Sequence, residues 1–409
     1  MVKRISLGVM LSAAAFFLIT VTIGTGKCAE TISFGLALPL SGAFRVEGNR
    51  TLDAYKFWAK KVNSRGGLLI GGKRYPVRLL FYDNRSNPEL CEELTEKLIT
   101  KDGIGLLLGG RNDRLVFAAS AAAERQGYPY ICAASADRLF SRGFRYLFST
   151  LPRVSDALRG CVEMLRRLKP RPSTVAILGV DDKDSALAYE AFKRFSEKAG
   201  FRVAHFELLP PALENYDSAL SKVKAKSPEV MLIGAPSSVT RKVLEAMRKI
   251  GFRPKAVVVN HIQEETDSSG MEIQKEFFIF APSEWGASLP FNGLFFGSAR
   301  EFDRSYHVEY QRHPGSLEAA VVAAALALQT ALEESGIQPP FDDEKRGALM
   351  KKLHEVDVET FFGKIRFGTD GVNVGHPPFV IQIRKRDIAT VFPKRYMEAA
   401  PVYPIPAWE

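Results

Sequence analysis

The sequence contains few of the residues on which metal sites and most catalytic sites depend. Its 409 residues include only four cysteines and six histidines. The cysteine spacing matches no zinc-binding pattern. The histidines form no metal-ligand spacing either; they stand at positions 205, 261, 307, 313, 354 and 376. We therefore expect no bound metal.

The short motifs of common α/β enzymes are also absent. A strand is predicted over residues 31–39, and LSGAF follows it where a dinucleotide site would have G-x-G-x-x-G. The sequence has neither the G-K-[ST] of a phosphate-binding loop nor the G-x-S-x-G of a nucleophile elbow. We expect no cofactor and no catalysis. An α/β enzyme remains an alternative, because a fold alone does not decide function.

Long apolar runs are missing after residue 30, so we expect no membrane span there. Before it, MVKR precedes an uncharged apolar run over residues 5–24 and then small residues. This pattern is typical of a secretory signal peptide, and we expect residues 1–29 to be removed on export to the periplasm. An uncleaved membrane anchor is one alternative, since the run is long for a signal. A lipid on Cys28 is another, although Lys27 fits a lipobox poorly.

Negative charge is in deficit, but no dense basic segment accounts for it. The formal net charge is +10, and the predicted leader holds three basic residues and no acid, which leaves 53 basic and 46 acidic residues. The excess is spread along the chain, as on an ordinary solvated surface. We expect no nucleic-acid partner.

Three cysteines follow the leader, at positions 91, 132 and 161. An exported protein can form a disulfide, but three cysteines cannot all pair with one another. Cys132 lies in an apolar predicted strand, and Cys161 lies on the apolar face of a predicted helix. We expect buried free thiols, and their redox state stays open.

Strand and helix patterns alternate along the chain, in two rounds. Short connections between alternating strands and helices predict parallel sheets with right-handed crossovers. The expected fold class is therefore α/β, with two doubly wound, Rossmann-like lobes around central parallel sheets. The first round has its predicted strands at residues 31–39, 75–83, 103–110 and 128–134. The second has them at residues 173–179, 201–209, 229–234 and 256–260.

Several segments are expected to cross between these lobes and so to form a multi-strand hinge. Residues 144–152 would make the first crossing, with Ser155 as the cap of the next helix, and residues 277–281 would carry the chain back. Three helices are predicted next, at residues 299–312, 317–335 and 343–354, and then a hairpin from Phe361 that joins FFGKIRF to FVIQIRKRD. We expect residues 30–149 and 284–372 in lobe 1, and residues 150–283 and 373–409 in lobe 2.

Sequence segments across nearly the whole chain resemble the type I periplasmic solute-binding proteins. The closest pattern is the leucine/isoleucine/valine-binding branch that feeds ABC importers. The segments that carry the resemblance are LALPLSGAF, VNSRGGLLIGGKRYPVRLLFYDN, GLLLGG, PYICAASADRLFSRGFRYLFST, TFFGKIRFGTDGVN and VYPIPAW. The resemblance implies a monomer whose hinged lobes close on a small ligand and then dock on a membrane permease. A sensory module that signals to a membrane receptor would use the same lobes.

The resemblance also places a ligand carboxylate on lobe 1, against hydroxyls and backbone N–H groups of two loops. Ala134 and Ser135 match the loop after the fourth strand. The loop after the third strand reads Arg111, Asn112 and Asp113, where the family usually has serines. Asp113 would repel a carboxylate. It either caps the following helix or contacts the ligand.

Lobe 2 departs further from the family pattern. Asp184 and Ser237 stand where aromatic side chains often cover the ligand, and Asn260 and His261 stand near the usual partner of the ligand amine. The set that recognises an α-amino acid is therefore mostly missing. An amino-acid-like solute, an amide or a small organic acid all remain open.

Three further residues complete the candidate site. Ser41 lies in the turn after the first strand, and Glu47 lies where family members place a side chain near the ligand. Glu47 is otherwise a surface acid of the loop. Trp285, just after the return crossing, either stacks on a ligand or packs at the lobe junction.

Overall fold

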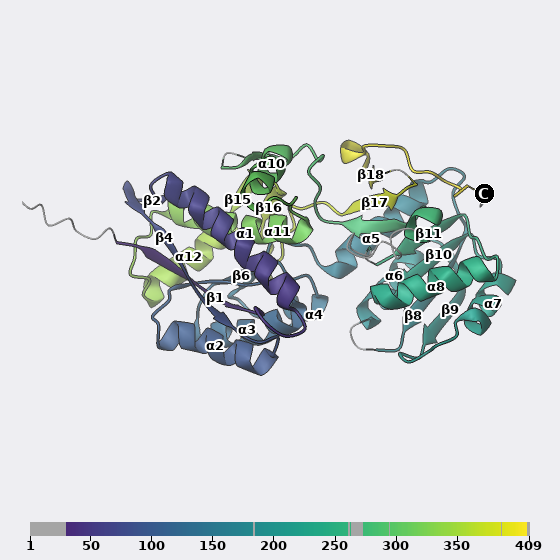
Figure 1. Ribbon diagram of the computed structural model, residues 1–409, viewed down its shortest axis with the longest axis horizontal. Helices are drawn as coiled ribbons and strands as arrows, with labels where there is room; N and C mark the ends of the chain where they lie inside the picture. Colours follow the sequence, from purple (N-terminus) through teal and green to yellow (C-terminus); the bar gives the residue numbers. More distant parts are fainter. Residues whose placement is uncertain are drawn as a thin grey trace, which may run out of the picture. The chain divides into compact units, whose positions relative to one another are not determined.

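Two open sheets, each with helices packed on it, organise the chain from Thr31 onward (Figure 1). The computed structural model describes residues 30–182, 185–260, 262, 273–293, 295–385 and 387–406. The predicted leader, Asp184 and His261 lie outside the described residues.

The first sheet has five parallel strands in the order β4-β1-β5-β6-β7. Side chains alternate between the faces of a strand, and here both faces are apolar: Leu106 and Leu108 enter one core while Leu107 enters another. This is why the strands read as continuous apolar runs. The strands are β1 (Ile32–Leu38), β4 (Val77–Asp83), β5 (Leu106–Leu108), β6 (Tyr130–Cys132) and β7 (Leu147–Ser149).

The helices around this sheet come from both ends of the chain. Asn87 caps one of them, as Asn commonly does, by accepting a hydrogen bond from the N–H of Leu90 at 2.7 Å. The three predicted late helices are confirmed. The helices of this half are α1 (Arg45–Ser64), α2 (Pro88–Thr100), α3 (Asp113–Gln126), α4 (Asp137–Phe140), α10 (Ala299–Tyr310), α11 (Ser316–Ser335) and α12 (Asp343–Glu355).

The alanine-rich helix α11 is an exception to the expectation that no segment after the leader has the length and composition of a membrane span. Among the described residues it alone is long and apolar enough to span a membrane, but 83% of that stretch is buried. It packs on α1, where the indole N–H of Trp58 donates to Gln329 at 2.9 Å. α11 is therefore a core helix of this half.

The second sheet has seven strands in the order β18-β17-β12-β11-β10-β8-β9. Strands β9 to β12 are parallel to β8, whereas β17 is antiparallel to both β12 and β18. The strands are β8 (Thr174–Val180), β9 (Arg202–Leu209), β10 (Val230–Gly234), β11 (Ala256–Val259), β12 (Phe280–Ser283), β17 (Phe379–Ile383) and β18 (Ile388–Phe392). The helices are α5 (Val154–Arg167), α6 (Ala186–Lys198), α7 (Asp217–Ala225) and α8 (Ser237–Lys249).

Three segments of chain run between the two sheets: from β7 to α5, after β12, and from β16 (Gly363–Arg366) to β17. Two of them lie against each other, since Ser149 bridges to Val372 and the Asn373 amide donates to the carbonyl of Thr150 at 2.9 Å. The prediction that Ser155 caps the next helix is wrong. α5 follows Arg153, which makes no side-chain cap bond, and the Ser155 hydroxyl instead donates to Asp137.

Two hairpins differ from the prediction. Residues 75–83 are not one strand: β2 (Leu68–Ile70) pairs with β3 (Lys73–Tyr75) through a turn of two glycines with positive φ, and Pro76 separates β3 from β4. Pro76 has no N–H to donate to a ladder, which favours a strand break there.

The predicted C-terminal hairpin is also wrong. β16 pairs with β15 (Asp357–Thr360), and β17 pairs with strands of the second sheet. The chain reverses at Phe361, Phe362 and Gly363, whose φ is 106°. Both phenylalanines are buried, so an apolar turn concealed this reversal in the sequence.

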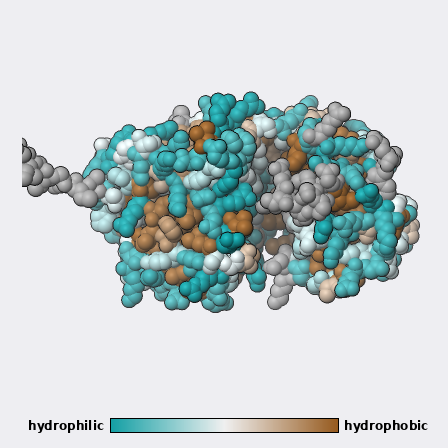
Figure 2. Space-filling view, viewed as in Figure 1, coloured by the Kyte–Doolittle hydropathy of each residue, from teal (hydrophilic) through white to brown (hydrophobic). Residues whose placement is uncertain are grey.

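The molecular surface is largely hydrophilic on the face seen in Figure 2, with apolar patches between the hydrophilic side chains. Large exposed apolar side chains come from separate elements, among them Val46 in α1, Phe206 in β9 and Val308 in α10. Single apolar side chains of this kind are normal on a soluble surface and mark no docking site by themselves.

Candidate functional site

The candidate site of the first half lies where β1, β5 and β6 end. In open α/β sheets the crevice at the carboxyl ends of the strands is the usual place for a ligand. Two loops meet there: the N–H of Gly109 donates to the carbonyl of Ile131 at 2.7 Å, and the N–H of Ala133 donates to that of Gly110 at 3.1 Å. These bonds hold the loop after β5 beside the loop after β6.

Arg111 forms a two-pronged ion pair with Glu284. The two N–O distances are 2.6 and 2.7 Å, and the side chains are 30% and 20% exposed. Burial opposes charge on both groups. Their attraction outweighs it, so the pKa of Glu284 is lowered and that of Arg111 is raised. Because Glu284 follows β12, this pair joins the end of β5 to the second sheet.

Asn112, not Asp113, caps helix α3. Its side-chain oxygen accepts from the N–H groups of Arg114 and Leu115 at 3.2 and 3.3 Å. An asparagine at this position satisfies N–H groups that have no partner within the helix. The capping alternative for Asp113 is therefore wrong.

The Asp113 carboxylate reaches the neighbouring loop instead. One of its oxygens accepts from the N–H groups of Ser135 and Ala136, both at 3.0 Å. Burial raises the pKa of Asp113, although these two N–H groups, Arg111 and Arg138 act in the opposite direction. The Asp113 carboxylate thus occupies two backbone N–H groups in the loop after β6, those of Ser135 and Ala136.

The other predicted residues of the loop after β6 are also bonded within the protein. Ala134 is fully buried, and its carbonyl accepts from the Ser149 hydroxyl at 2.5 Å. The carbonyl of Ser135 accepts from the N–H of Val154 at 2.9 Å. Val154 begins α5, so this loop also touches a helix of the second half.

The turn after β1 brings Ser41 to Asp83, which ends β4. The N–H groups of Leu40, Ser41 and Arg85 donate to one Asp83 oxygen at 2.9, 3.1 and 2.8 Å. The carbonyl of Ser41 accepts from the Ser86 hydroxyl at 2.7 Å. Ser41 is thus part of a network that fixes the turn.

Glu47 lies in the first turn of α1 and lines a small pocket. The pocket volume is about 10 Å³, which is room for one water-sized group. Thr51 also lines it, and among the described residues nothing bonds to the buried Thr51 hydroxyl. The other lining residues are Ala37, Leu38, Pro39, Gly110, Asn112, Leu115, Val116 and Tyr130.

Four ligand-binding residues were predicted at the second sheet, and the structure describes two of them, Asn260 and Ser237. Asn260 follows β11, and its side-chain oxygen accepts from the N–H of Ala235 at 3.2 Å. Ser237 is the first residue of α8 and is partly exposed. Since β10 and β11 are parallel neighbours, Ser237 and Asn260 come from the same edge of this sheet.

Trp285 lies in a core and not on an open surface. It is 7% exposed, and its indole N–H donates to the carbonyl of Phe361 at 3.0 Å. Its ring meets Phe302 and Phe361 edge to face. These contacts support the packing alternative for this residue.

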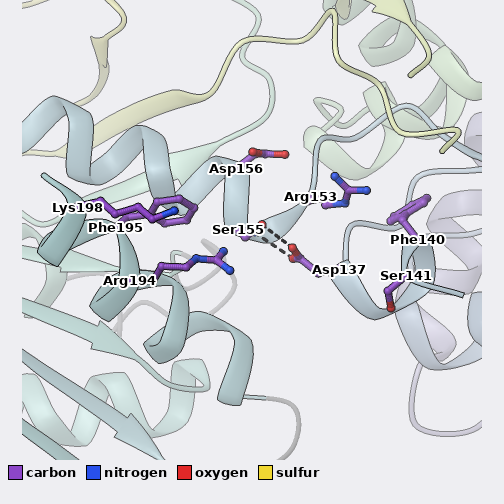
Figure 3. A pocket seen from close by; sticks show the side chains of 9 residues that line it. All are labelled: Asp137, Phe140, Ser141, Arg153, Ser155, Asp156, Arg194, Phe195 and Lys198. Carbon is purple, nitrogen blue, oxygen red and sulfur yellow. Dashed lines mark hydrogen bonds between the residues drawn. The ribbon is translucent and has the colours of Figure 1, made fainter. Parts of the chain in front are cut away.

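A larger open groove of about 340 Å³ lies where α4 meets α5 and α6. Figure 3 shows Ser155 bonded to Asp137 in the middle of the groove, with basic side chains on both sides. No sequence pattern marks this groove, since its lining residues come from three helices and the residues beside them and form no motif. The groove is lined by Asp137, Phe140, Ser141, Arg153, Ser155, Asp156, Arg194, Phe195 and Lys198.

Two functional candidates were missed from the sequence, Glu284 and Thr51. Glu284 had a usable signal, because a charged residue directly after an apolar strand marks the carboxyl edge of a parallel sheet. Thr51 had none, since it reads as one more position on the buried face of α1.

The three cysteines that the structure describes, Cys91, Cys132 and Cys161, are buried and unpaired, as expected. Burial raises the pKa of Cys91 and of Cys132 to about 12, and it raises that of Cys161 as well. Within the part of the chain that the structure describes, no group of three or more histidine, cysteine or acidic residues is arranged to hold a metal ion.

Comparison with known proteins identifies the family. The Leu/Ile/Val-binding protein homolog 8 of Brucella suis is 23% identical over 405 residues, or 95% of each chain. A structure from Silicibacter pomeroyi, described as a candidate branched-chain amino acid ABC transporter, matches 92% of this chain and 99% of its own with a TM-score of 0.79 at 18% identity. An ABC transporter substrate-binding protein of Desulfitobacterium hafniense, in complex with Leu, matches 88% of this chain and 100% of its own with a TM-score of 0.72 at 18% identity. The family model of the periplasmic binding proteins matches residues 31–387, and the chain therefore belongs to that family.

Proposed function

We propose that this chain is the extracytoplasmic substrate-binding protein of an ABC importer and binds a small solute between its two α/β halves. One observation carries the proposal: the polar loops after β5 and β6, and those after β10 and β11, all stand at the carboxyl edges of two open sheets that three chain segments connect. Such edges are where open α/β folds bind ligands.

The proposed mechanism is hinge closure. Three short connections concentrate bending at a few residues, so the halves can move as bodies. A ligand that touches both edges stabilises the closed form only by the contacts that it makes in that form and not in the open one. The closed form would then dock on the membrane permease.

The names of the relatives and the chain's own residues together support the proposed solute class. The relatives are named for leucine, isoleucine and valine, and one related structure holds Leu. We propose an amino-acid-like solute, an amide or a small organic acid for this chain. We further propose a periplasmic monomer without catalysis, with residues 30–149 and 284–372 in one lobe and residues 150–283 and 373–409 in the other.

The first experiment identifies the solute. Protein purified from its own host is examined by native mass spectrometry, and the same protein, unfolded and refolded to remove any retained ligand, is screened by thermal shift against amino acids, amides and organic acids. A ligand at 100 times its Kd stabilises the folded state by about 2.7 kcal/mol, which such a screen detects. If no small molecule binds, the proposal is wrong.

The second experiment locates the ligand. We expect it to slow hydrogen exchange in the loops at residues 109–113 and 133–136 and also in the loop at 235–238. Protection on one sheet alone would contradict hinge closure. Capture of a permease from membranes supports import, whereas capture of a receptor kinase would favour sensing.

A further inference from the structure

The end of β6 has two backbone N–H groups that point to one acceptor, and the protein supplies that acceptor itself. The N–H groups of Ser135 and Ala136 both donate to Asp113 at 3.0 Å. An anionic ligand at this place would have to displace the carboxylate and lie beside its negative charge. The loop after β6 is therefore closed to a ligand carboxylate.

The end of β1, a short way along the same edge, offers acceptors instead. Glu47 and Thr51 line the small pocket there, and Thr51 is 1% exposed with no hydrogen-bond partner for its hydroxyl among the described residues. Glu47, Gly110 and Asn112 are partly exposed, so the pocket opens toward solvent on their side. A buried polar atom without a partner is unfavourable, which makes a ligand group that bonds to it strongly preferred.

The charged side chains at this edge favour a ligand group that donates hydrogen bonds. Arg111 lies at this edge, and Glu284 engages it through two bonds. Glu47 and Asp113 both act on Arg111 electrostatically, so two further carboxylates lie near that ion pair. The pocket volume of about 10 Å³ suits a group the size of water or of an ammonium.

We propose that this edge receives the amine end of the solute, with Glu47 and Thr51 as acceptors, and that Asp113 excludes a carboxylate by occupying the N–H groups of Ser135 and Ala136. The inference rests on the proposed function and deepens it, because it names the solute as an amine without a free carboxylate at this end. Asp113 is then the residue that sets this selectivity.

The variants D113N and D113S separate the parts of this inference. In D113N the amide oxygen still accepts from both N–H groups, so they stay occupied. In D113S the shorter side chain leaves them open. T51V keeps the shape of Thr51 but removes its hydroxyl, E47Q removes the charge of Glu47, and E359Q, on the exposed face of β15, is the matched control.

Minimal probes test the edge without knowledge of the solute. Methylammonium and acetate are titrated into the full mature chain to high millimolar concentration, and amide NMR resonances are followed. We expect methylammonium to shift Thr51 in the wild type and in E359Q, but not in T51V. We expect acetate to shift Ser135 and Ala136 only in D113S. If acetate shifts them in the wild type, or if the pocket holds only water and methylammonium leaves Thr51 unchanged, the inference is wrong.

A matched ligand series gives the second test. Leucine, leucinamide, isoamylamine and 4-methylpentanoate share one branched side chain and differ only in their amine and carboxyl groups, and an aromatic series is made in the same way. We expect the amide and the amine to bind the wild type at least about tenfold more tightly than the two acids, and E47Q to lose about tenfold for the amines. Tighter binding of either acid by the wild type would overturn the inference and leave the proposed function intact. If the host screen finds no solute while methylammonium still shifts Thr51, only the proposed function fails.

Discussion

The two sheet edges differ in how their polar groups are held. At the first edge, Asp83 and Asp113 each accept hydrogen bonds from the backbone of a neighbouring loop, so these loops are fixed before any ligand arrives. At the second edge, Asp182 accepts from the N–H and the hydroxyl of Ser185 in its own loop, both at 2.8 Å, and Asn260 accepts from the N–H of Ala235 at 3.2 Å. Preorganised groups lose little freedom on binding. If the proposed function is correct, the first half is the more firmly held wall of the site and the second half completes it.

The largest expected effect comes from removing the bridge between the edges. R111A leaves the partly buried Glu284 without its cation, so we expect a loss of about 2–4 kcal/mol in the free energy of unfolding, measured in urea. R384A is the control, because Arg384 pairs with the exposed Asp387 and should lose less than about 1 kcal/mol. An equal loss in the two variants would contradict the view that the Arg111 pair is special.

A smaller effect is expected where the carboxylate of the first edge is shortened. D113S strands two N–H groups and should destabilise the protein by about 1–3 kcal/mol, while D113N should lose less because its amide oxygen still accepts from both. Thermal unfolding of the two variants checks the order. D113N less stable than D113S would refute the bonding of Asp113 to Ser135 and Ala136.

Helix caps compare the two edges directly. N112A removes a side-chain cap of α3 and should cost about 1 kcal/mol. S237A, at the start of α8, removes no side-chain cap bond and should stay within about 0.5 kcal/mol of the wild type. N87A, which removes the cap of α2 away from the edge, is the reference for N112A. If S237A matched N112A, the second edge would be as firmly built as the first.

The smallest expected effect is a change in the pH dependence of stability. The pKa of Glu284 is lowered by folding, so its contribution is present above the unfolded value near 4.5 and is lost on acidification. E284Q should therefore flatten the acid loss of stability. The pKa of Asp113 is raised, so the folded state binds its proton more tightly, and D113N should make the acid loss steeper. Urea unfolding between pH 3 and pH 6 measures both slopes, and slopes that change in the same direction would contradict this pair of shifts.

The fold could be predicted because its signals are local. Apolar runs such as LLL at residues 106–108 indicate buried parallel strands, and glycines after the helices indicate turns. Both patterns can be read without knowing where the segments lie in space. The hairpins were harder, since the reversal at Phe361 uses residues that also fill a core.

The candidate site could be predicted only in part because its contacts are not local. The sequence pattern placed Arg111 and Asp113 at the carboxyl edge of the first sheet. It could not show that Glu284, 173 positions away, would pair with Arg111. Nor could it decide between capping and any other bond for Asp113, since the choice depends on where two backbone N–H groups of another loop point. The spacing of residues along the chain does not show in which direction those N–H groups point.

The three buried thiols can report separately on the unfolding of the two halves. Cys91 and Cys132 lie in a core of the first sheet, whereas Cys161 lies in a core of the second. A thiol reacts as the thiolate, and these thiols are both buried and held protonated, so an alkylating reagent modifies each one only after its surroundings unfold. The alkylation rate of Cys161, set against those of the other two, would therefore time the unfolding of each half in the same tube, with no label added.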